Sequence, residues 1–313
     1  MQAHPSVSIV IPCFNQGSFL KEAIESVLGQ TRRADRIIVV DDGSVDNTAA
    51  VASEYPQVGY VFQKNRGLAA ARNTGLRRVT TEFVLFHDSD DILKPAAIER
   101  CLMALDKHPQ AAFVYGGFWW VDQKRGFIGE ELAKPQTDHF GALLAKNYIM
   151  MHGTVMYRTE ILRSAGGFNE SLPRCEDYDV YLRLTQSHSI ASYEGVAAEY
   201  RRHNENISLN APLMLKTVRK LLARYTRIAQ TKQEWRVAHA EGLRYWSGFW
   251  GPRIEQSLIE ECKGRRRLNV LVSLTATGLR YDPEFATRLS RRALRKARAA
   301  VGRMHRQGAA SSR

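Results

Sequence analysis

The sequence has few cysteines and no long apolar run. Its four cysteines lie far apart, without the short spacing of zinc knuckles or redox pairs, at Cys13, Cys101, Cys175 and Cys262. Nowhere do about 18 apolar residues follow one another, and no charged leader precedes the first apolar run. We therefore expect no membrane span, no secretory signal and a reduced, cytoplasmic compartment.

The first two thirds of the sequence lack the basic excess that the last third carries. Residues 1–210 contain 22 Lys and Arg against 25 Asp and Glu, whereas residues 211–313 contain 23 against 7. A basic appendage can meet anionic lipid, an acidic partner or nucleic acid. Nucleic acid is disfavoured here, because no aromatic residue interleaves the final basic run and no recognition fold accompanies it.

That final run, residues 288–307, spaces apolar side chains among arginines. The apolar positions are Leu289, Leu294, Ala297 and Val301. This pattern is typical of an amphipathic helix that lies on an anionic membrane. A solvated helix or a frayed tail fits the same pattern, and the sequence leaves that alternative open.

Before residue 110 the chain alternates short β-branched runs with helical spacing. A hydrophobic content of 44% over 313 residues is enough for a large core. The expected strands cover residues 7–11, 37–40, 58–62 and 83–86, and helical patterns cover 19–28 and 67–77. This alternation predicts an α/β fold, with a mostly parallel sheet and helices on both faces.

Polar clusters follow three of these strands. They read PCFN at 12–15, DDGS at 41–44 and HDSDD at 87–91. In open α/β sheets, ligands bind beyond the carboxyl ends of the strands, so these clusters are expected to meet in space. The crowded Asp88, Asp90 and Asp91 would raise one another's pKa unless a cation sat among them, and Mg²⁺ or Mn²⁺ prefers such oxygen ligands. The alternative is a solvated acidic turn, with Asp91 capping the next helix.

The joint pattern resembles a known family. VSIVIPCFNQGSFLKEAIESVLGQT, IIVVDDGSVDNT, NRGLAAARNTGL and FVLFHDSDD are similar to the ordered motifs of family 2 glycosyltransferases, inverting enzymes with a GT-A-type (Rossmann-like) fold. GGFNESLPRCEDYDVYLRL at 166–184 and YRRHNENIS at 200–208 look like the family's later motifs. The resemblance covers about residues 6–210.

The resemblance implies a donor site at the strand ends. The aromatic at Phe14 would pack on the nucleotide base beside Pro12, and Asp42 would hydrogen-bond the base with Asp41 as a supporting neighbour. Residues for the diphosphate and its Mn²⁺ or Mg²⁺ ion follow from the same resemblance: Asp90 and His203 as metal ligands, Asp88 at the ribose or the metal, and Arg72 and Arg66 at phosphate or base.

The resemblance also implies an acceptor site. Its Glu-Asp segment places the catalytic base at Asp177, with Glu176 beside it facing the acceptor. Further contacts to acceptor or diphosphate are expected from His152, Trp119 and Arg201. Trp119 could stack on a sugar, although core packing is an alternative for it or for Trp120.

The sequence thus predicts a metal-dependent, inverting transferase that moves a sugar from a nucleotide sugar, UDP-linked by preference, to a glycan or a lipid-linked acceptor. Residues 1–110 would form the nucleotide-sugar half of the catalytic domain, 111–210 the acceptor half and 211–313 a helical basic extension. The extension would contact the cytoplasmic face of an anionic membrane. Two alternatives remain: a nonenzymatic carbohydrate- or nucleotide-binding protein on this fold, and a sugar nucleotidyltransferase, for which a Gly-rich loop with Lys is missing.

Overall fold

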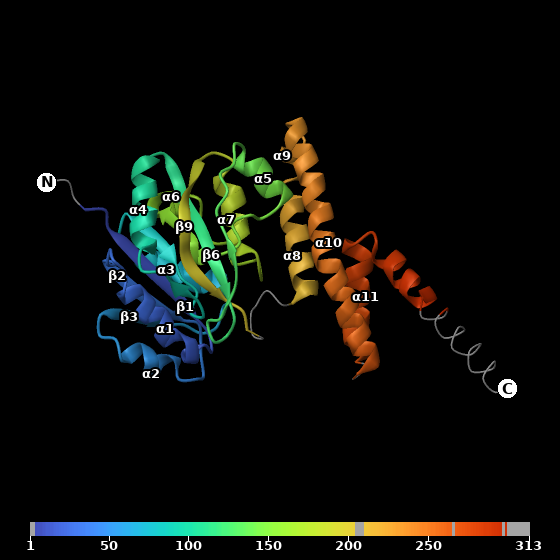
Figure 1. The fold of residues 1–313 in the computed structure, drawn as a ribbon, viewed down its shortest axis with the longest axis horizontal. Coiled ribbons are helices and arrows are strands. Elements are labelled where there is room, and N and C mark those ends of the chain that lie inside the picture. The colour runs from blue at the N-terminus through green and yellow to red at the C-terminus, as the bar shows by residue number, and fades with distance from the viewer. Residues whose placement is uncertain (1–3, 204–209, 265–266, 296–297, 299–313) are drawn as a thin grey trace. The chain divides into compact units, whose positions relative to one another are not determined.

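A single sheet organises the first part of the chain (Figure 1). The computed structural model describes residues 4–203, 210–264, 267–295 and 298, and the chain divides into the units Met1–Asn206 and Ile207–Arg313. Within the described residues the sheet has nine strands. They are β1 Val7–Cys13, β2 Arg36–Asp41, β3 Val58–Phe62, β4 Phe83–Phe86, β5 Ile92–Leu93, β6 Ala111–Val121, β7 Phe127–Glu131, β8 Met156–Arg158 and β9 Ser189–Arg201.

The strand order is β3-β2-β1-β4-β8-β6-β9-β5, with β7 paired to β6. The four strands predicted from alternation are present and mutually parallel. Beyond them the sheet is mixed, because β8 runs antiparallel to β4 and β6, and β5 runs antiparallel to β9. The α/β prediction is confirmed, and the sheet is mixed, with parallel pairing in β3-β2-β1-β4 and between β6 and β9. Apolar spacing reveals a strand without revealing the direction in which it enters the sheet.

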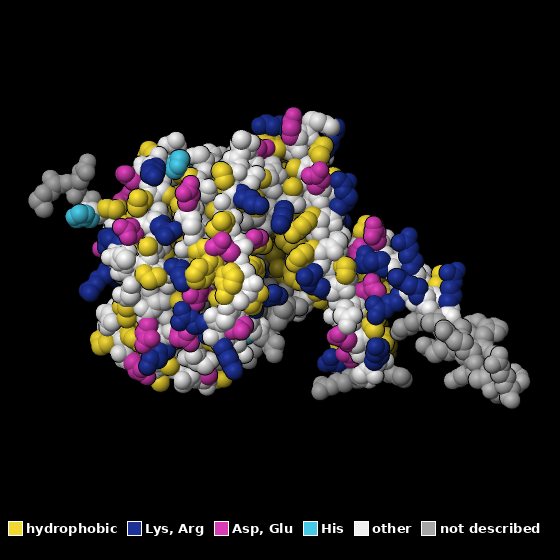
Figure 2. Space-filling model, in the orientation of Figure 1, with side chains coloured by type: hydrophobic (Ala, Val, Ile, Leu, Met, Phe, Trp, Pro, Cys, Tyr) yellow, Lys and Arg dark blue, Asp and Glu magenta, His cyan; other side chains and the backbone are white. Residues whose placement is uncertain are grey.

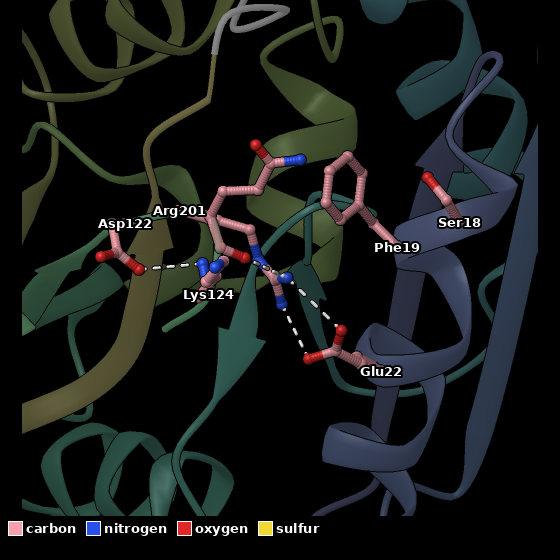
Figure 3. A pocket seen from close by; sticks show the side chains of 7 residues that line it. Ser18, Phe19, Glu22, Asp122, Lys124 and Arg201 are labelled. Atoms are coloured by element: carbon pink, nitrogen blue, oxygen red, sulfur yellow. Dashed lines mark hydrogen bonds and ion pairs between the residues drawn. The ribbon is translucent and has the colours of Figure 1, made fainter. Parts of the chain in front are cut away.

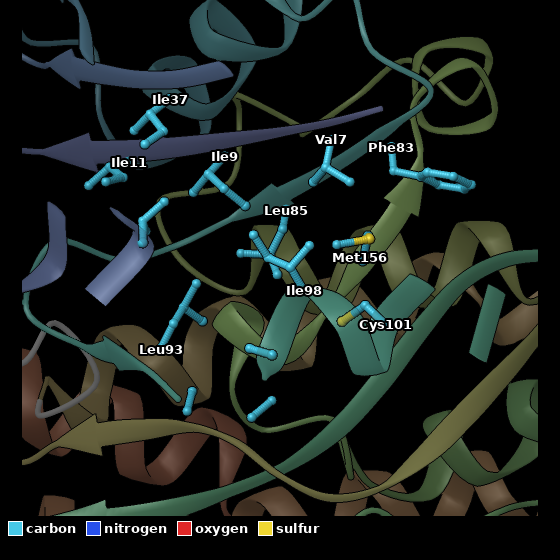
Figure 4. Packing of buried hydrophobic residues seen from close by; sticks show 14 of the residues in the cluster. Val7, Ile9, Ile11, Ile37, Phe83, Leu85, Leu93, Ile98, Cys101 and Met156 are labelled. Carbon is cyan, nitrogen blue, oxygen red and sulfur yellow. The ribbon is translucent and has the colours of Figure 1, made fainter. Parts of the chain in front are cut away.

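Helices cover both faces of this sheet. They are α1 Gly17–Leu28, α2 Thr48–Ser53, α3 Leu68–Arg78, α4 Ala97–Lys107, α5 His139–Ala145, α6 Thr159–Ser164 and α7 Glu176–Leu184, with a 3-10 turn at His152–Thr154. On one face Ile9 and Leu85 belong to the same buried cluster as Ile98 of α4 (Figure 4). Successive strand residues point to opposite faces, so Val10 meets α3 instead. Gly75 permits that approach, since a Cβ there would lie 2.2 Å from Val10 Cγ1.

The second unit is helical. Its elements are α8 Ala211–Arg224, α9 Thr226–Ala229, α10 Gln233–Lys263 and α11 Leu268–Tyr281, and residues 285–295 are also helical. Helix α8 is amphipathic and buries Leu215, Val218, Leu221 and Leu222. Of the apolar positions in the final basic run, residues 288–307, Ala297 and Val301 lie outside the described residues. Among the helices of the described chain, none combines the length and apolarity needed to cross a membrane.

Candidate active site

The ends of β1 and β2 place the first two polar clusters side by side. Cys13 and Asp41 are the last partners in the parallel register of these strands. Phe14 then projects with 46% of its surface exposed, whereas Pro12 is buried within β1. Phe14 therefore offers an accessible ring at the sheet edge, and Pro12 contributes to the strand beneath it.

The loop after β1 is tied to the loop after β2. The Asn15 N–H donates to Ser44 Oγ at 2.9 Å, and the Val45 N–H donates to Asn15 Oδ1 at 2.9 Å. Asn15 has φ of 52°, a left-handed conformation that Asn tolerates better than most residues. It does not cap the next helix. The Gly17 N–H at the start of α1 donates instead to Asp46 Oδ2 at 2.9 Å.

Asp42 is buried at the end of β2 and organises the segment before α3. Its Oδ1 accepts from Gln63 Nε2 at 2.6 Å and from the Arg66 N–H at 2.9 Å, and its Oδ2 accepts from the Gly67 N–H at 2.8 Å. A carboxylate offers about four lone pairs, and donors from the described residues occupy three of them. Asp41 is committed elsewhere, to the Ser44 N–H and to the Tyr60 hydroxyl.

Arg72 of α3 is a buried bridge between two of the predicted site segments. Its Nη2 donates to Asp88 Oδ1 at 2.7 Å, and its Nη1 donates to Glu176 Oε1 at 2.7 Å. The guanidinium is enclosed and also faces the Phe168 ring. Arg72 thus fixes the loop after β4 against the start of α7, and its charge neutralises acids from both.

Asp90 is approached by an imidazole and an amide. Its Oδ2 lies 2.9 Å from His203 Nε2 and accepts from Gln16 Nε2 at 3.0 Å. The His203 ring also packs on Phe19, with centroids 4.9 Å apart. No Lys or Arg of the described chain pairs with Asp90, which sets it apart from Asp88.

The side chains of Asp90 and His203 suit a cation that substrate phosphates help to bind. Among the described residues, no group of three or more His, Cys, Asp and Glu is arranged to hold a metal by itself. Of the three predicted metal ligands, Asp90 and His203 are in contact, whereas Asp88 faces Arg72. Mg²⁺ and Mn²⁺ accept one or two protein ligands when phosphate oxygens supply the rest. One carboxylate and one imidazole therefore fit such an ion.

Asp177 occupies the first turn of α7, directly after the buried Glu176. Burial, reinforced by the charge of Glu176 and opposed by that of Arg72, raises the pKa of Asp177 to about 7. A general base works best when its pKa lies near the working pH. The residue before the pair, Cys175, has φ of 62°, a left-handed conformation that is costly outside Gly and recurs at functional sites.

Asp91 and Arg201 make contacts of their own, separate from those of Asp90. Asp91 does not cap a helix, because its Oδ1 accepts from the Arg201 N–H at 2.9 Å and β5 follows directly. The Arg201 side chain pairs with Glu22 at 2.9 Å and faces the Phe19 ring. Arg201, Glu22 and Phe19 line a pocket of about 620 Å³, where Figure 3 shows Arg201 and Glu22 pointing toward one another.

His152 and Trp119 lie in different surroundings. His152 is buried and stacks on Phe86, and its Nε2 lies 3.0 Å from the Tyr157 hydroxyl. It supports the aromatic core beneath the site and has no surface to offer an acceptor. Trp119 is half-buried on β6, with the Lys94 ammonium 4.2 Å from its ring centroid and its Nε1 bonded to Glu130.

Several residues that contribute to the site could not be recognised from the sequence. Gln16, Gln63 and Glu22 are ordinary surface residue types in a linear reading, and their partners are 74, 21 and 179 residues away. Asp46 had a partial signal, since it belongs to the turn-rich DDGSVDNT segment.

The chain is similar to known proteins in sequence and in fold. The sequence model of Glycosyl transferase family 2 matches residues 8–166, half of the chain. An uncharacterized glycosyltransferase of Rickettsia conorii is 32% identical over 210 residues, which cover 64% of this chain and 35% of that protein. The chondroitin synthase of Escherichia coli is 30% identical over 209 residues, covering 66% and 30%. The chain thus spans about a third of the length of these relatives.

Solved structures share the fold at low identity. The mannosyltransferase PcManGT from Pyrobaculum calidifontis, in complex with GDP-Man and Mn²⁺, is 17% identical with a TM-score of 0.60, and 90% of this chain and 88% of that chain are covered. TarS 1-349 of S. aureus, in complex with UDP-GlcNAc, is 17% identical with a TM-score of 0.56, covering 88% and 91%. These likenesses establish the fold as that of GT-A glycosyltransferases.

Proposed function

The chain belongs to glycosyltransferase family 2, and from that premise we propose that it transfers a sugar from a nucleoside-diphosphate sugar to a hydroxyl of a glycan or lipid-linked acceptor, with inversion. The observation that carries this proposal is Asp177, a carboxylate with pKa raised to about 7 that lies beside a buried Arg72 bridge to the Asp-x-Asp loop. Residues 1–110 would hold the donor, and residues 111–210 would shape the acceptor side.

The nucleoside would bind at the ends of β1 and β2. The exposed Phe14 ring offers a face on which a base can stack, and Asp42 Oδ2 can accept from a base N–H. A uracil N–H is a donor of the required kind, as is a ring N–H of guanine or thymine, and UDP is the donor nucleotide that we propose first. The relatives with UDP-GlcNAc and GDP-Man support a nucleotide sugar without fixing which one.

The diphosphate would lie near Asp90 and His203. A bound Mn²⁺ or Mg²⁺ would supply positive charge to the diphosphate as it leaves. Asp90 and His203 would hold that ion, with Asp88 near it and oriented by Arg72. The Asp90 Oδ2 hydrogen bonds to Gln16 and His203 keep this carboxylate oriented before the donor arrives.

The acceptor would be activated at the start of α7. Asp177 takes the proton of the acceptor hydroxyl as its oxygen attacks the anomeric carbon, and the bond from that carbon to the diphosphate breaks. One in-line displacement needs one base and inverts the anomeric centre. Glu176, expected from the sequence to face the acceptor, is buried and paired with Arg72, so it would hold the charge balance beside the base.

Calorimetry with UDP, GDP, CDP and dTDP tests the donor site. We expect one nucleotide to bind with Mn²⁺ present and to lose at least about tenfold in affinity with chelator, because a bridging cation is removed. Asp90→Asn should cause a similar loss, and Glu160→Gln, an exposed acid on α6, should cause none. Turnover is then measured with the nucleotide sugars that contain the nucleotide found to bind. Failure of all four nucleotides to bind would reject the donor site.

A further inference from the structure

One face of α11 is apolar and directed into solvent. Leu268 is 74% exposed, and Val272 and Leu279 are each 59% exposed. At about 100° per residue these three positions fall within roughly 40° of one another around the helix. They lie on one side of the helix, with Thr275 between Val272 and Leu279, and we call these three apolar side chains the α11 stripe.

The opposite face of α11 holds the helix in its unit. Leu274 and Gly278 are buried there, and a Cβ on Gly278 would lie 2.5 Å from the Phe285 ring. The helix packs on α8 and α10 through this side. The α11 stripe is therefore not an unformed part of the core, because the core contacts of α11 are already made elsewhere on its circumference.

The surroundings of the α11 stripe are basic. Among the described residues from Lys263, the last residue of α10, to Arg298, eight are Lys or Arg and two are acids. Arg267 pairs with Glu261, and Arg288 and Arg292 pair with Glu255. Arg280, Arg291 and Arg295 are exposed. In the face drawn in Figure 2, Lys and Arg side chains gather over the C-terminal helices.

We propose that the α11 stripe is a docking surface for an anionic lipid bilayer, into whose interface Leu268, Val272 and Leu279 insert. An apolar stripe flanked by Lys and Arg is what an interfacial helix requires, since apolar burial and attraction to anionic headgroups add. The charge argues for lipid over a second copy of this chain, because two copies would bring like charges together. Docking of this kind would bring the protein to lipid-linked substrates, although lipid binding needs neither donor nor turnover.

Vesicle flotation with the whole chain tests this surface. We expect the protein to float with phosphatidylcholine vesicles that contain about 30 mol% phosphatidylglycerol and not with phosphatidylcholine alone. Raising the salt from about 0.15 M to about 0.5 M should weaken binding, since it shortens the screening length. The combined variant Leu268→Ser, Val272→Ser and Leu279→Ser should lose at least about tenfold in partitioning, because its apolar insertion is removed.

A matched control keeps the result specific. Met103→Ser with Val237→Ser removes exposed apolar side chains from α4 and α10, and it should bind vesicles as the wild type does. All variants should keep the wild-type circular dichroism and melting profile, because every changed residue is exposed. Two outcomes overturn the proposal: flotation that the stripe variant leaves unchanged, or a wild type that does not float with the anionic vesicles. In the second case, a wild-type dimer that the stripe variant converts to monomer would assign the stripe to a second copy of this chain.

Discussion

Acidic pairs lie at the end of β2 and at the start of α7, but the surroundings of the two pairs differ. At the end of β2, Asp42 receives three donors, two of them backbone N–H groups. At the start of α7, Asp177 receives the N–H of Tyr178 at 2.7 Å and lies against Glu176, and its pKa rises to about 7. An aspartate is thus an acceptor of three hydrogen bonds in one place and, in the mechanism that we propose, a proton site in the other.

Removing the proton site should have the largest effect. We expect Asp177→Asn to lower kcat by about 10²- to 10⁴-fold, because an amide cannot take the proton of the acceptor. Nucleotide binding measured by calorimetry should stay unchanged. In the wild type, kcat/KM should rise about tenfold per pH unit below about 7 and level off above it, which the variant should not show. Equal turnover in wild type and variant would remove Asp177 from the mechanism.

Arg72 links the two regions, and Arg72→Lys should have the next largest effect. Lysine keeps the charge but cannot bridge Asp88 and Glu176 with two rigid donors. We expect kcat to fall by about 10²-fold, the scale that a small misplacement of reacting groups costs. Arg78→Lys, an exposed change on the same helix, is the control. If both variants keep full turnover, the bridge is a packing feature only.

The sequence predicted the strands of the first half and the polar clusters at the ends of three of them, because both follow from local patterns. Strand periodicity and polar clusters at strand ends are read from neighbouring residues, whereas the roles of Phe14, Asp42 and Asp90 came from the family resemblance and stay predictions. The sheet's mixed direction could not be predicted, because β8 enters between β4 and β6 from a distant segment.

Contacts between residues far apart in the chain also could not be predicted from the sequence. Arg72 was expected at phosphate or base, yet it is buried between Asp88 and a Glu 104 residues away. His152 was expected to contact a ligand, yet it stacks within the aromatic core. A side chain's type shows what it can bond to, but which partner it meets depends on how distant segments pack.

Disturbing Asp42, the acceptor of three hydrogen bonds, should have a moderate effect. In Asp42→Asn the amide nitrogen would face an N–H donor, so at least one of the three hydrogen bonds is lost. We expect the free energy of unfolding to fall by about 1–3 kcal/mol and nucleotide affinity to fall by roughly tenfold, which is about 1.4 kcal/mol. Urea unfolding and calorimetry measure the two effects. Asp106→Asn, an exposed acid on α4, should change neither.

The smallest expected effect is a change of melting temperature with pH that depends on Asp177 at the start of α7. Because the folded protein raises the pKa of Asp177 from 3.8 to about 7, the folded state retains a proton that the unfolded chain releases between these values. The stability that this proton provides is complete below pH 3.8 and is lost as the pH rises through about 7. Asp177→Asn carries no ionisable group at this position. The difference in melting temperature, variant minus wild type, should therefore increase by a few degrees as the pH rises from about 4 to 7. Above this range the difference should stay constant. A difference that does not change with pH would mean that Asp177 titrates in the same range in the folded and unfolded chain.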